Sequence, residues 1–486
     1  MDIKQFIGGF IKALPNLGGV GQNDTKVNLV TEANIAISIA EAASQNGFRR
    51  GDGTLYVFTG TKYEKLEKED IDRLICGILE ELNIGVVYQT KSVETIFKRI
   101  YRSIKMKVFD PSRSIISFNN RVLNVSDMTV HPHSEKWMTR IHLDFDYDKN
   151  ARCPRWEQFL VDVMGDDYEG RQILQEFLGL MFINNEELSI EASLFIYGTG
   201  SNGKSVIQYM MKSILGEYCS SYELTQLCSA QSDAGYYLAD ANGKLLNYAS
   251  DMGKKDFSGG RFKAISAREP IQVRPIGQSP FEAKDMPLMI SNINEIPETT
   301  DATEGYWRRF LLIHLSRMFN PEDQDKELKY KLRAERSGVF NWILEGRKRI
   351  LAQKGHFTES VKMQKMVRAI RVDSNSVLSF LKEKGYQGDR PVGVQFTEMA
   401  MFSRDLMEAY RSYCADWGNK PKAKKAFKAD LERAGFEYRP NMRVGGAFSN
   451  GYVFYKVDNI YGEEVNLDPI EQKEGQSMIE DDGMPF

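Results

Sequence analysis

The residues best suited to chemistry form a glycine-rich loop that ends in a lysine and fits the pattern GxxxxGK[ST]. Glycines let backbone N–H groups wrap around a phosphate without Cβ clashes. Lys204 can reach the β- and γ-phosphates of a nucleotide, and Ser205 can ligate Mg²⁺. The alternative is a glycine-rich turn with an unrelated lysine, but an apolar strand precedes this loop and a helix follows it. We therefore predict a nucleotide-binding loop formed by Gly198, Gly200, Ser201, Asn202, Gly203, Lys204, Ser205 and Val206.

Hydrolysis of a nucleotide needs three further kinds of group: an acid, a polar sensor of the γ-phosphate and often an arginine. Asp251 ends an apolar strand expected over 244–249, and Asn294 follows a second strand expected over 287–291. Arg308 and Arg309 stand before a third strand expected over 310–314. As alternatives, Asp251 and Asn294 form turns at strand ends, and the two arginines lie at a solvated or ion-paired edge.

The elements that must position these groups suggest several regions along the 486 residues. Strands alternate with helices over 191–320, which predicts an α/β domain with a mostly parallel sheet. The other regions are a mixed α/β segment over 1–110, short strands and two helices over 111–190, and a helical linker over 321–370. Residues 371–457 predict three helices and a two-stranded ribbon, an order that suits a winged helix, and the acidic segment 458–486 lacks periodicity and is predicted to be disordered.

The charge of the chain is unevenly distributed. Lys and Arg total 64 and Asp and Glu total 67, a net charge of −3 that by itself argues against nucleic-acid binding. Residues 458–486 hold nine acidic residues and one basic residue, a net of −8, so the remaining chain carries −3 + 8 = +5. The sequence therefore predicts a mildly basic body with an acidic tail.

Cysteine usage and hydropathy restrict the class of protein. The five cysteines form no CxxC pair, which favours a reducing cytoplasm and gives no structural zinc signature. No signal-peptide pattern and no apolar run of about 18 residues is found, so we expect a cytoplasmic protein without a membrane segment.

The four motifs together resemble the superfamily 3 helicases of the phage/plasmid and poxvirus primase-helicase type. Lys204, Asp251, Asn294 and Arg309 fall within about a hundred residues in the order typical of that family. The resemblance implies a P-loop, AAA+-like ATPase core that binds ATP and Mg²⁺, the metal being held by Ser205 and Asp251. It also implies a hexameric ring on single-stranded or forked DNA, a neighbour-supplied Arg309, and a phage or mobile-element origin with action in a bacterial host cytoplasm.

The sequence departs from this family in two places. The family usually has Glu where Asp251 stands, which leaves open whether Asp251 activates water or supports Mg²⁺ alone. A primase-polymerase domain is not recognised. Asp144, Asp146 and Asp148 alternate as a two-metal carboxylate set would on a strand. Because the segment matches the region that precedes the ATPase in the family, we interpret them as solvated acids, with a metal site as the alternative, and primase activity is not predicted.

DNA contacts are expected in two regions. In the family a β-hairpin between the acid and the sensor carries a basic residue, and the matching stretch here is 270–284. Arg274 and Lys284 flank its turn, and Lys263 and Arg268 precede it. Residues 420–443 hold eight basic and three acidic residues with interleaved aromatic side chains, a pattern that can bind phosphates. For both regions the alternative is a solvated charged surface.

The end of the chain resembles the tip of bacterial single-stranded-DNA-binding proteins. Such tips dock a terminal Phe and neighbouring acids on replication partners, a form of carboxylate capture. The corresponding residues are Glu480, Asp481, Asp482, Pro485 and Phe486, which suggests binding to host replication proteins, with an ordinary acidic tail as the alternative.

These observations favour an ATP-dependent DNA helicase. One alternative is a replication initiator or loader that uses ATP to switch DNA binding without unwinding. A second is a non-enzymatic DNA-binding scaffold with a degenerate ATP site.

Overall fold

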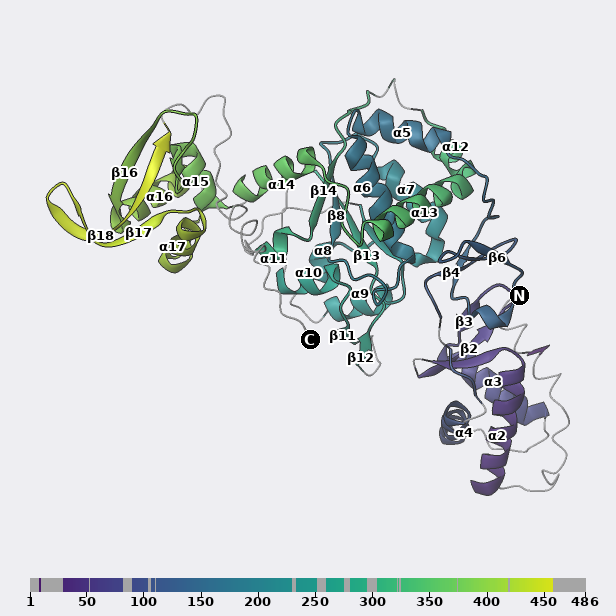
Figure 1. Cartoon of the computed structure of the whole chain (residues 1–486). Helices are drawn as coiled ribbons and strands as arrows, with labels where there is room; N and C mark the ends of the chain where they lie inside the picture. Colours follow the sequence, from purple (N-terminus) through teal and green to yellow (C-terminus); the bar gives the residue numbers. More distant parts are fainter. Residues whose placement is uncertain are drawn as a thin grey trace, which may run out of the picture. The chain divides into compact units, whose positions relative to one another are not determined.

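The computed structural model describes residues 8–9, 29–51, 53–81, 90–103, 106–109, 111–229, 233–250, 259–274, 280–294, 304–320, 322, 325–373, 375–417 and 420–457. The chain divides into two compact units (Figure 1). The first takes residues 1–251, 260–294 and 313–359, and the second takes residues 252–259, 295–312 and 360–486.

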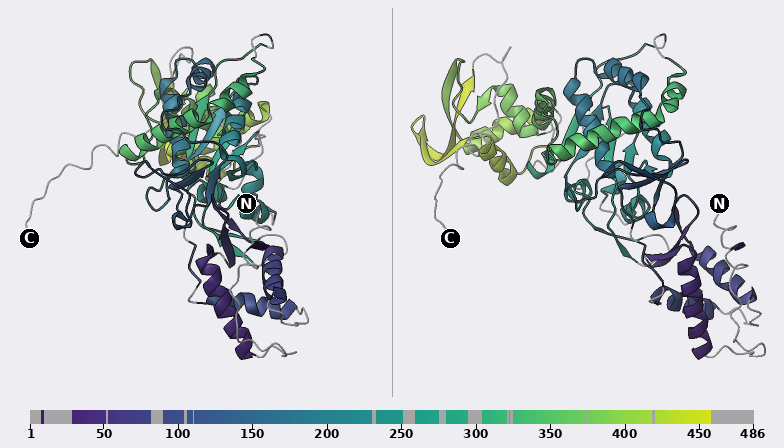
Figure 2. Two further views of the ribbon diagram at one scale, coloured as in Figure 1. Left: turned by 90° about the vertical axis from the view of Figure 1, so that its right-hand side faces the viewer. Right: turned by 45° about the vertical axis from the view of Figure 1, so that its right-hand side comes forward.

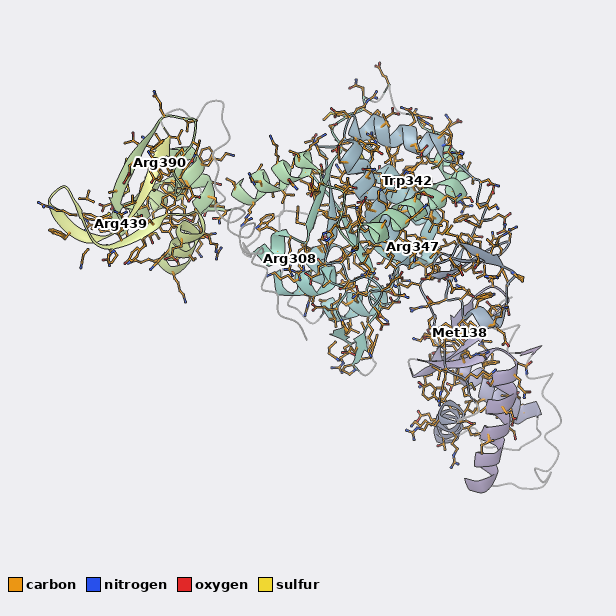
Figure 3. The ribbon with its side chains drawn as sticks, in the orientation of Figure 1. Met138, Arg308, Trp342, Arg347, Arg390 and Arg439 are labelled. Atoms are coloured by element: carbon orange, nitrogen blue, oxygen red, sulfur yellow. The ribbon has the colours of Figure 1, made fainter. Side chains whose placement is uncertain are left out.

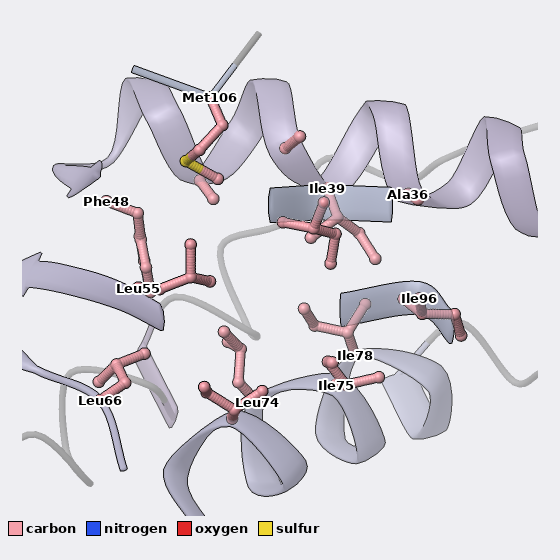
Figure 4. Close-up of a cluster of buried hydrophobic side chains, with 14 of the residues drawn as sticks. Ala36, Ile39, Phe48, Leu55, Leu66, Leu74, Ile75, Ile78, Ile96 and Met106 are labelled. Atoms are coloured by element: carbon pink, nitrogen blue, oxygen red, sulfur yellow. The ribbon is translucent and has the colours of Figure 1, made fainter. Parts of the chain in front are cut away.

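The N-terminal region of the first unit is a small α/β layer. Its elements are α2 (Leu29–Gln45), β1 (Phe48–Gly51), β2 (Thr54–Phe58), β3 (Tyr63–Lys65), α3 (Lys68–Glu81) and α4 (Thr90–Arg102). The strands form an antiparallel sheet in the order β1-β2-β3. Apolar side chains that recur at helical spacing, such as Leu74, Ile75 and Ile78 of α3, meet Ile39 of α2 and Leu55 of β2 in one buried core (Figure 4). The mixed α/β character predicted for this region is confirmed.

A second group of strands precedes the central sheet. It consists of β4 (Ile115–Phe118), β5 (Val122–Asn124), β6 (Thr129–His131) and β7 (Ile141–Leu143), followed by α5 (Pro154–Met164) and α6 (Tyr168–Gly179). Pro154 opens α5 at its first position, where the missing N–H leaves no bond unmade. The Asp167 side chain accepts a hydrogen bond from the Gly170 N–H and caps α6.

The central sheet has five strands in the order β14-β8-β13-β10-β9. Its strands are β8 (Ser193–Tyr197), β9 (Cys219–Ser220), β10 (Leu246–Ala249), β13 (Leu288–Ile293) and β14 (Phe310–His314). Between them along the chain lie the helices α7 (Lys204–Leu215), α8 (Leu224–Leu227), α9 (Ala234–Ala241), α10 (Gly259–Ser266) and α11 (Glu304–Trp307). A separate pair of strands, β11 (Ile271–Val273) and β12 (Phe281–Ala283), lies between α10 and β13 in the sequence. The pairs β8/β13, β13/β10 and β10/β9 are parallel. The predicted α/β domain with a parallel sheet is therefore confirmed, and Figure 2 shows it from two further sides.

Helices after the sheet close the first unit. α12 (Leu328–Ala334) and α13 (Arg336–Ala352) follow β14, and α13 packs closely on α6. A Cβ on Gly346 would lie 2.0 Å from the carbonyl oxygen of Gln175, so only glycine permits this approach of the two backbones. Arg347 of α13 is buried and donates to the carbonyls of Phe182 and Val125, at 3.0 and 2.9 Å (Figure 3). Residues 336–352 therefore pack into the first unit instead of forming a separate linker.

The C-terminal part of the second unit has its own core. Its elements are α14 (Val361–Asp373), α15 (Ser376–Lys384), β15 (Tyr386–Gln387), β16 (Phe396–Phe402), α16 (Ser403–Asp416), α17 (Lys424–Arg433), β17 (Glu437–Val444) and β18 (Ala447–Val457). Phe380, Tyr410 and Phe454 are fully buried in this core. The predicted helices and the ribbon β17/β18 are present, but the ribbon belongs to a four-stranded sheet with β15 and β16, which the sequence reading missed. The winged-helix assignment stays a prediction.

Candidate nucleotide-binding site

Parallel pairing gathers the predicted loop and sensor at one edge of the sheet. Ile293 of β13 pairs with Tyr197 of β8, so Asn294 and Gly198 are the next residues along two neighbouring strands. The Gly198 N–H donates to the Ile293 carbonyl at 3.1 Å. Because the carboxyl ends of parallel strands share an edge, this edge carries both groups. Strand order, which the sequence alone did not give, thus places Asn294 beside the phosphate loop.

The loop itself adopts a conformation that requires glycine. Gly200 and Gly203 have φ angles of 118° and 90°, and Ser201 has a φ of 48°. A Cβ on Gly203 would lie 2.9 Å from Cγ1 of Val163 and 3.0 Å from the ring of Phe159, both on α5. Val163 and Phe159 of α5 therefore pack directly against the loop at Gly203, a contact that we did not predict from the sequence.

Lys204 is the first residue of α7, and its side chain is half-buried. The Lys204 Nζ donates to the Asn202 Oδ1 at 3.1 Å and to the Gly198 carbonyl. The Ser205 side chain, next in the helix, is exposed. An ammonium, an exposed hydroxyl and the N-terminal N–H groups of a 12-residue helix form a donor set that suits a polyphosphate and its metal.

Asn202 braces the loop from inside. Its side chain is 3% exposed, and its Oδ1 accepts from the Gly200 N–H at 2.9 Å as well as from Lys204. Its Nδ2 donates to the Leu315 carbonyl at 3.5 Å, and the Phe319 N–H donates to the Ser201 carbonyl at 3.0 Å. The predicted ligand residue Asn202 is thus turned toward the protein. Its side chain ties the loop to the segment that follows β14.

The sensor strand carries two asparagines with different environments. Asn294 is exposed after the end of β13, whereas Asn292 is 2% exposed inside the sheet. The Tyr248 hydroxyl of β10 donates to the Asn292 Oδ1 at 3.1 Å. Burial raises the pKa of Tyr248 well above its ordinary value, so the hydroxyl stays protonated and remains a donor. Asn292, which we did not single out from the sequence, links the two strands that end at the site.

Asp251 lies outside the described residues. The strand that leads to it, β10, ends at Ala249 in register with Ser291 of β13, so β10 ends at the same edge of the sheet. Gln208 of α7 donates to the Tyr248 carbonyl at 3.0 Å and holds this strand end against the helix. The structure thus locates the end of the strand before Asp251, and the role of Asp251 stays a prediction.

The two candidate arginines differ in exposure. Arg309 is 6% exposed, and its guanidinium donates to the Gly305 carbonyl of the preceding helix α11. Arg308, labelled in Figure 3, is exposed. The family pattern favoured Arg309 as the residue supplied to a neighbour, but in this structure Arg308 is the one with an accessible side chain.

The cations predicted to contact DNA also differ in how exposed their side chains are. β11 and β12 pair as an antiparallel hairpin, with Gln272 opposite Glu282, while residues 275–279 lie outside the described part. Arg274 is exposed beside this hairpin, and Lys284 has a side chain 73% exposed and paired with Glu282 at 3.4 Å. Lys263 is half-buried in α10.

The prediction that Arg268 contacts DNA is wrong, because its side chain is buried. It is 4% exposed, has a φ of 52° and donates to the Ile183 carbonyl at 3.3 Å. Burial, and then the charge of Arg113, lower its pKa to about 10. Arg268 is thus an interior residue and not part of an exposed hairpin surface, because its chain turns inward directly after α10.

Cations of the C-terminal region have two roles. Lys424, Lys425 and Lys428 are exposed on α17, and the Lys428 ammonium lies 4.3 Å from the centroid of the Tyr438 ring. Lys422 donates to Asp430 at 2.9 Å and to Asn375 at 3.0 Å, so it stabilises the fold. The interleaved basic and aromatic pattern thus gives a surface on α17 and β17 together with an internal ion pair.

Asp144, Asp146 and Asp148 are exposed. Asp144 accepts from the Asn119 amide at 3.2 Å, and Asp148 accepts from the Asn150 N–H at 2.9 Å. Among the described residues, no three His, Cys, Asp or Glu side chains come together as metal ligands. Within the same residues, no helix is both long and apolar enough to cross a bilayer. The acidic tail, including Glu480, Asp481, Asp482, Pro485 and Phe486, lies outside them.

Comparison with known proteins gives two family matches. Residues 43–165 match the family described as D5 N terminal like, and residues 196–309 match a family of unknown function, DUF5906. The chain is 26% identical over 148 residues to a putative helicase, L207/L206, of Acanthamoeba polyphaga mimivirus. That match covers 29% of this chain and 15% of the relative, so the chain spans a small part of the mimivirus protein.

Among solved structures, the chain is similar to the C-terminal region of NrS-1. One apo structure, the A form, has a TM-score of 0.46 at 14% identity and covers 82% of this chain and 93% of that one. A second apo structure has a TM-score of 0.45 at 12% identity, covering 86% and 98%. The phosphate loop on its parallel sheet, the D5 N-terminal-like segment and the similarity to a putative helicase together fit a superfamily 3 helicase of the phage/plasmid and poxvirus primase-helicase type.

Proposed function

We propose that the chain is an ATP-dependent DNA helicase that acts in the replication of a phage or mobile element. The observation that carries this proposal is the pairing of β8 with β13, which brings the phosphate loop and Asn294 to one sheet edge. A nucleotide seated on the loop would meet a polar sensor on the adjacent strand. Such a sensor contacts the γ-phosphate, so its loss on hydrolysis can change the conformation of the rest of the molecule.

ATP and Mg²⁺ fit the residues at this edge. Lys204 and the N–H groups that begin α7 would hold the phosphates, and Ser205 with Asp251 would hold the metal. Bound Mg²⁺ would neutralise charge on the β- and γ-phosphates. Before binding, Lys204 donates to Asn202 and Gly198, so nucleotide phosphates must replace these two acceptors.

Asn294 and Arg308 complete the proposed catalytic set. Asn294 is exposed at the strand end and would orient water or sense the γ-phosphate. An exposed arginine is what a neighbouring subunit requires, because a guanidinium supplied from outside must be able to reach into the site. We therefore assign the neighbour-supplied role to Arg308, and assign to Arg309 the task of holding α11 in place.

The ring and its DNA track belong to the same proposal. We infer a hexamer that encloses one strand, with ATP between subunits. Arg274 and Lys284 beside the β11–β12 hairpin would contact phosphates without regard to sequence, as translocation requires. Lys424, Lys425 and Lys428 of α17 offer a second phosphate surface. We place this activity in the cytoplasm of a bacterial host, where the C-terminal tail would recruit replication proteins.

The decisive experiment compares wild type with Lys204→Ala in unwinding of a forked duplex, with ATP hydrolysis and oligomer size measured on the same samples. The proposal expects DNA-stimulated hydrolysis, strand separation and a nucleotide-supported hexamer, with the first two lost in Lys204→Ala. DNA-stimulated hydrolysis without strand separation would identify an initiator or loader. In a separate replication assay, normal replication with Lys204→Ala would identify a non-enzymatic scaffold.

A further inference from the structure

A polar cavity of about 440 Å³ lies at the sheet edge opposite the phosphate loop. Its wall includes residues 184–186, which precede β8, and residues 284–286, which precede β13. The phosphate loop and Asn294 follow the far ends of these two parallel strands. Since a six-residue strand is roughly 20 Å long, the cavity is separate from the proposed ATP site.

Three cations, Arg113, Arg268 and Lys284, and two acids, Glu186 and Asp285, line this cavity. The Arg113 Nε donates to the Asp285 Oδ1 at 2.7 Å, and the Arg140 Nη1 donates to the Asp285 Oδ2 at 3.0 Å. One carboxylate is thus shared by two arginines. Arg268 is 4% exposed and forms no ion pair among the described residues, so the acid that acts on its buried charge, Asp285, is one that Arg113 and Arg140 already share.

Four polar atoms of the cavity residues are buried without a hydrogen-bond partner in the described structure. They are the Nε and Nη2 of Arg268, the Nη1 of Arg113 and the Oδ1 of Asn185. Buried polar groups are almost always paired, and exceptions point to a bound ion, water or ligand. Three N–H donors suit an anion, whereas the Asn185 oxygen suits a hydroxyl or amino group beside that anion.

We propose that this cavity binds a nucleotide through its phosphate, with Arg268 and Arg113 on the phosphate and Asn185 on a sugar or base donor. A volume of about 440 Å³ lies within the range of small-ligand sites and exceeds what an inorganic anion needs. The four atoms have almost no exposed surface, so binding requires a small rotation of the guanidinium groups. Lys284, at the rim, directly follows β12 of the hairpin, so the nucleotide is either free or part of a DNA strand.

The test uses the full chain with Lys204→Ala, which silences the proposed ATP site and makes the result independent of ATP hydrolysis. Calorimetric titrations compare thymidine 5′-monophosphate, inorganic phosphate and thymidine. We expect the monophosphate to bind more tightly than phosphate, and thymidine not to bind. Displacement of the monophosphate by 5′-phosphorylated oligo(dT) would assign the site to a strand, and failure to displace it would assign the site to a free nucleotide.

Two variants locate the binding. Ser112→Asp adds a carboxylate to the cavity wall and keeps the acceptor for the Ser114 N–H, which now donates to the Ser112 hydroxyl at 3.2 Å. Arg268→Met removes the buried charge. Each change should weaken binding by about tenfold to a hundredfold, the loss expected for a charged hydrogen bond. Ser126→Asp, the same charge change at an exposed position outside the cavity, should leave binding unchanged.

Three outcomes would overturn the proposal. They are no binding of the monophosphate, equal affinity for inorganic phosphate, and unchanged binding in both Ser112→Asp and Arg268→Met. Thermal unfolding of each variant separates lost binding from lost folding. If Arg268→Met does not fold, Ser112→Asp alone decides the outcome.

Discussion

Replacement of Gly203 by alanine tests how the phosphate loop is held. Gly203 has a φ of 90°, a backbone conformation that costs an alanine about 1 to 2 kcal/mol. The new Cβ would also lie 2.9 Å from Val163 and 3.0 Å from Phe159, which are 0% and 3% exposed and cannot move aside freely. Overpacking of this kind costs about 1 to 3 kcal/mol.

The two contributions give about 2 to 5 kcal/mol against the loop conformation seen here. A domain whose stability lies in the middle or upper part of the typical range of about 5 to 15 kcal/mol remains folded at this cost. Nucleotide affinity should therefore fall by roughly 30-fold to several thousand-fold while the protein stays folded. Titration with a fluorescent ATP analogue measures the affinity, and thermal unfolding measures the fold.

Two further variants separate backbone strain from packing. Gly200 also has a positive φ, 118°, but a Cβ added there would meet no atom within 4 Å, so Gly200→Ala should show strain alone and a smaller loss. Adding Val163→Ala to Gly203→Ala should recover the share of the packing cost that comes from Val163, with Val163→Ala alone completing the double-mutant cycle. Wild-type affinity in Gly203→Ala, or no recovery in the double variant, would refute the view that α5 is a rigid support.

Further predictions concern the arginines and the pH dependence. Arg308→Ala should lower ATP hydrolysis by a factor on the order of 10³ or more with unchanged unfolding temperature, whereas Arg309→Ala should lower the unfolding temperature because it removes the buried donor to Gly305. If Arg309→Ala alone stops hydrolysis in a fully stable protein, our assignment of the two roles is reversed. Burial first, and then the charge of Lys62, lower the pKa of His142 below its ordinary 6.5. The folded state therefore binds this proton less readily than the unfolded state, and stability should decline as pH falls from about 6.5. His142→Gln should flatten the fall in urea midpoint between pH 7.5 and 5.5, and an unaltered slope would contradict this origin.

Local sequence was sufficient for several elements of the fold. The apolar run before Gly198, the loop glycines and Lys204 predicted a strand, a turn and a helix, and β8 and α7 form there. Each of these depends on residues near in sequence, such as glycines that permit positive φ. We did not predict β16 from the sequence, because its seven residues, FTEMAMF, give a weak strand pattern. In the structure all seven are exposed or half-buried. It forms because β18 supplies the hydrogen bonds along its whole length.

The chemistry of the site was therefore determined by the sequence: which residue types can hold a phosphate, in what order they occur, and which family they resemble. The tertiary structure decided which of them can act together. It placed Asn294 beside the loop by pairing β13 with β8, and turned Asn202 inward as a brace. It also exposed Arg308 and buried Arg309 and Arg268. The reason is that burial and strand order depend on packing between distant segments, which no spacing of residues along the chain specifies.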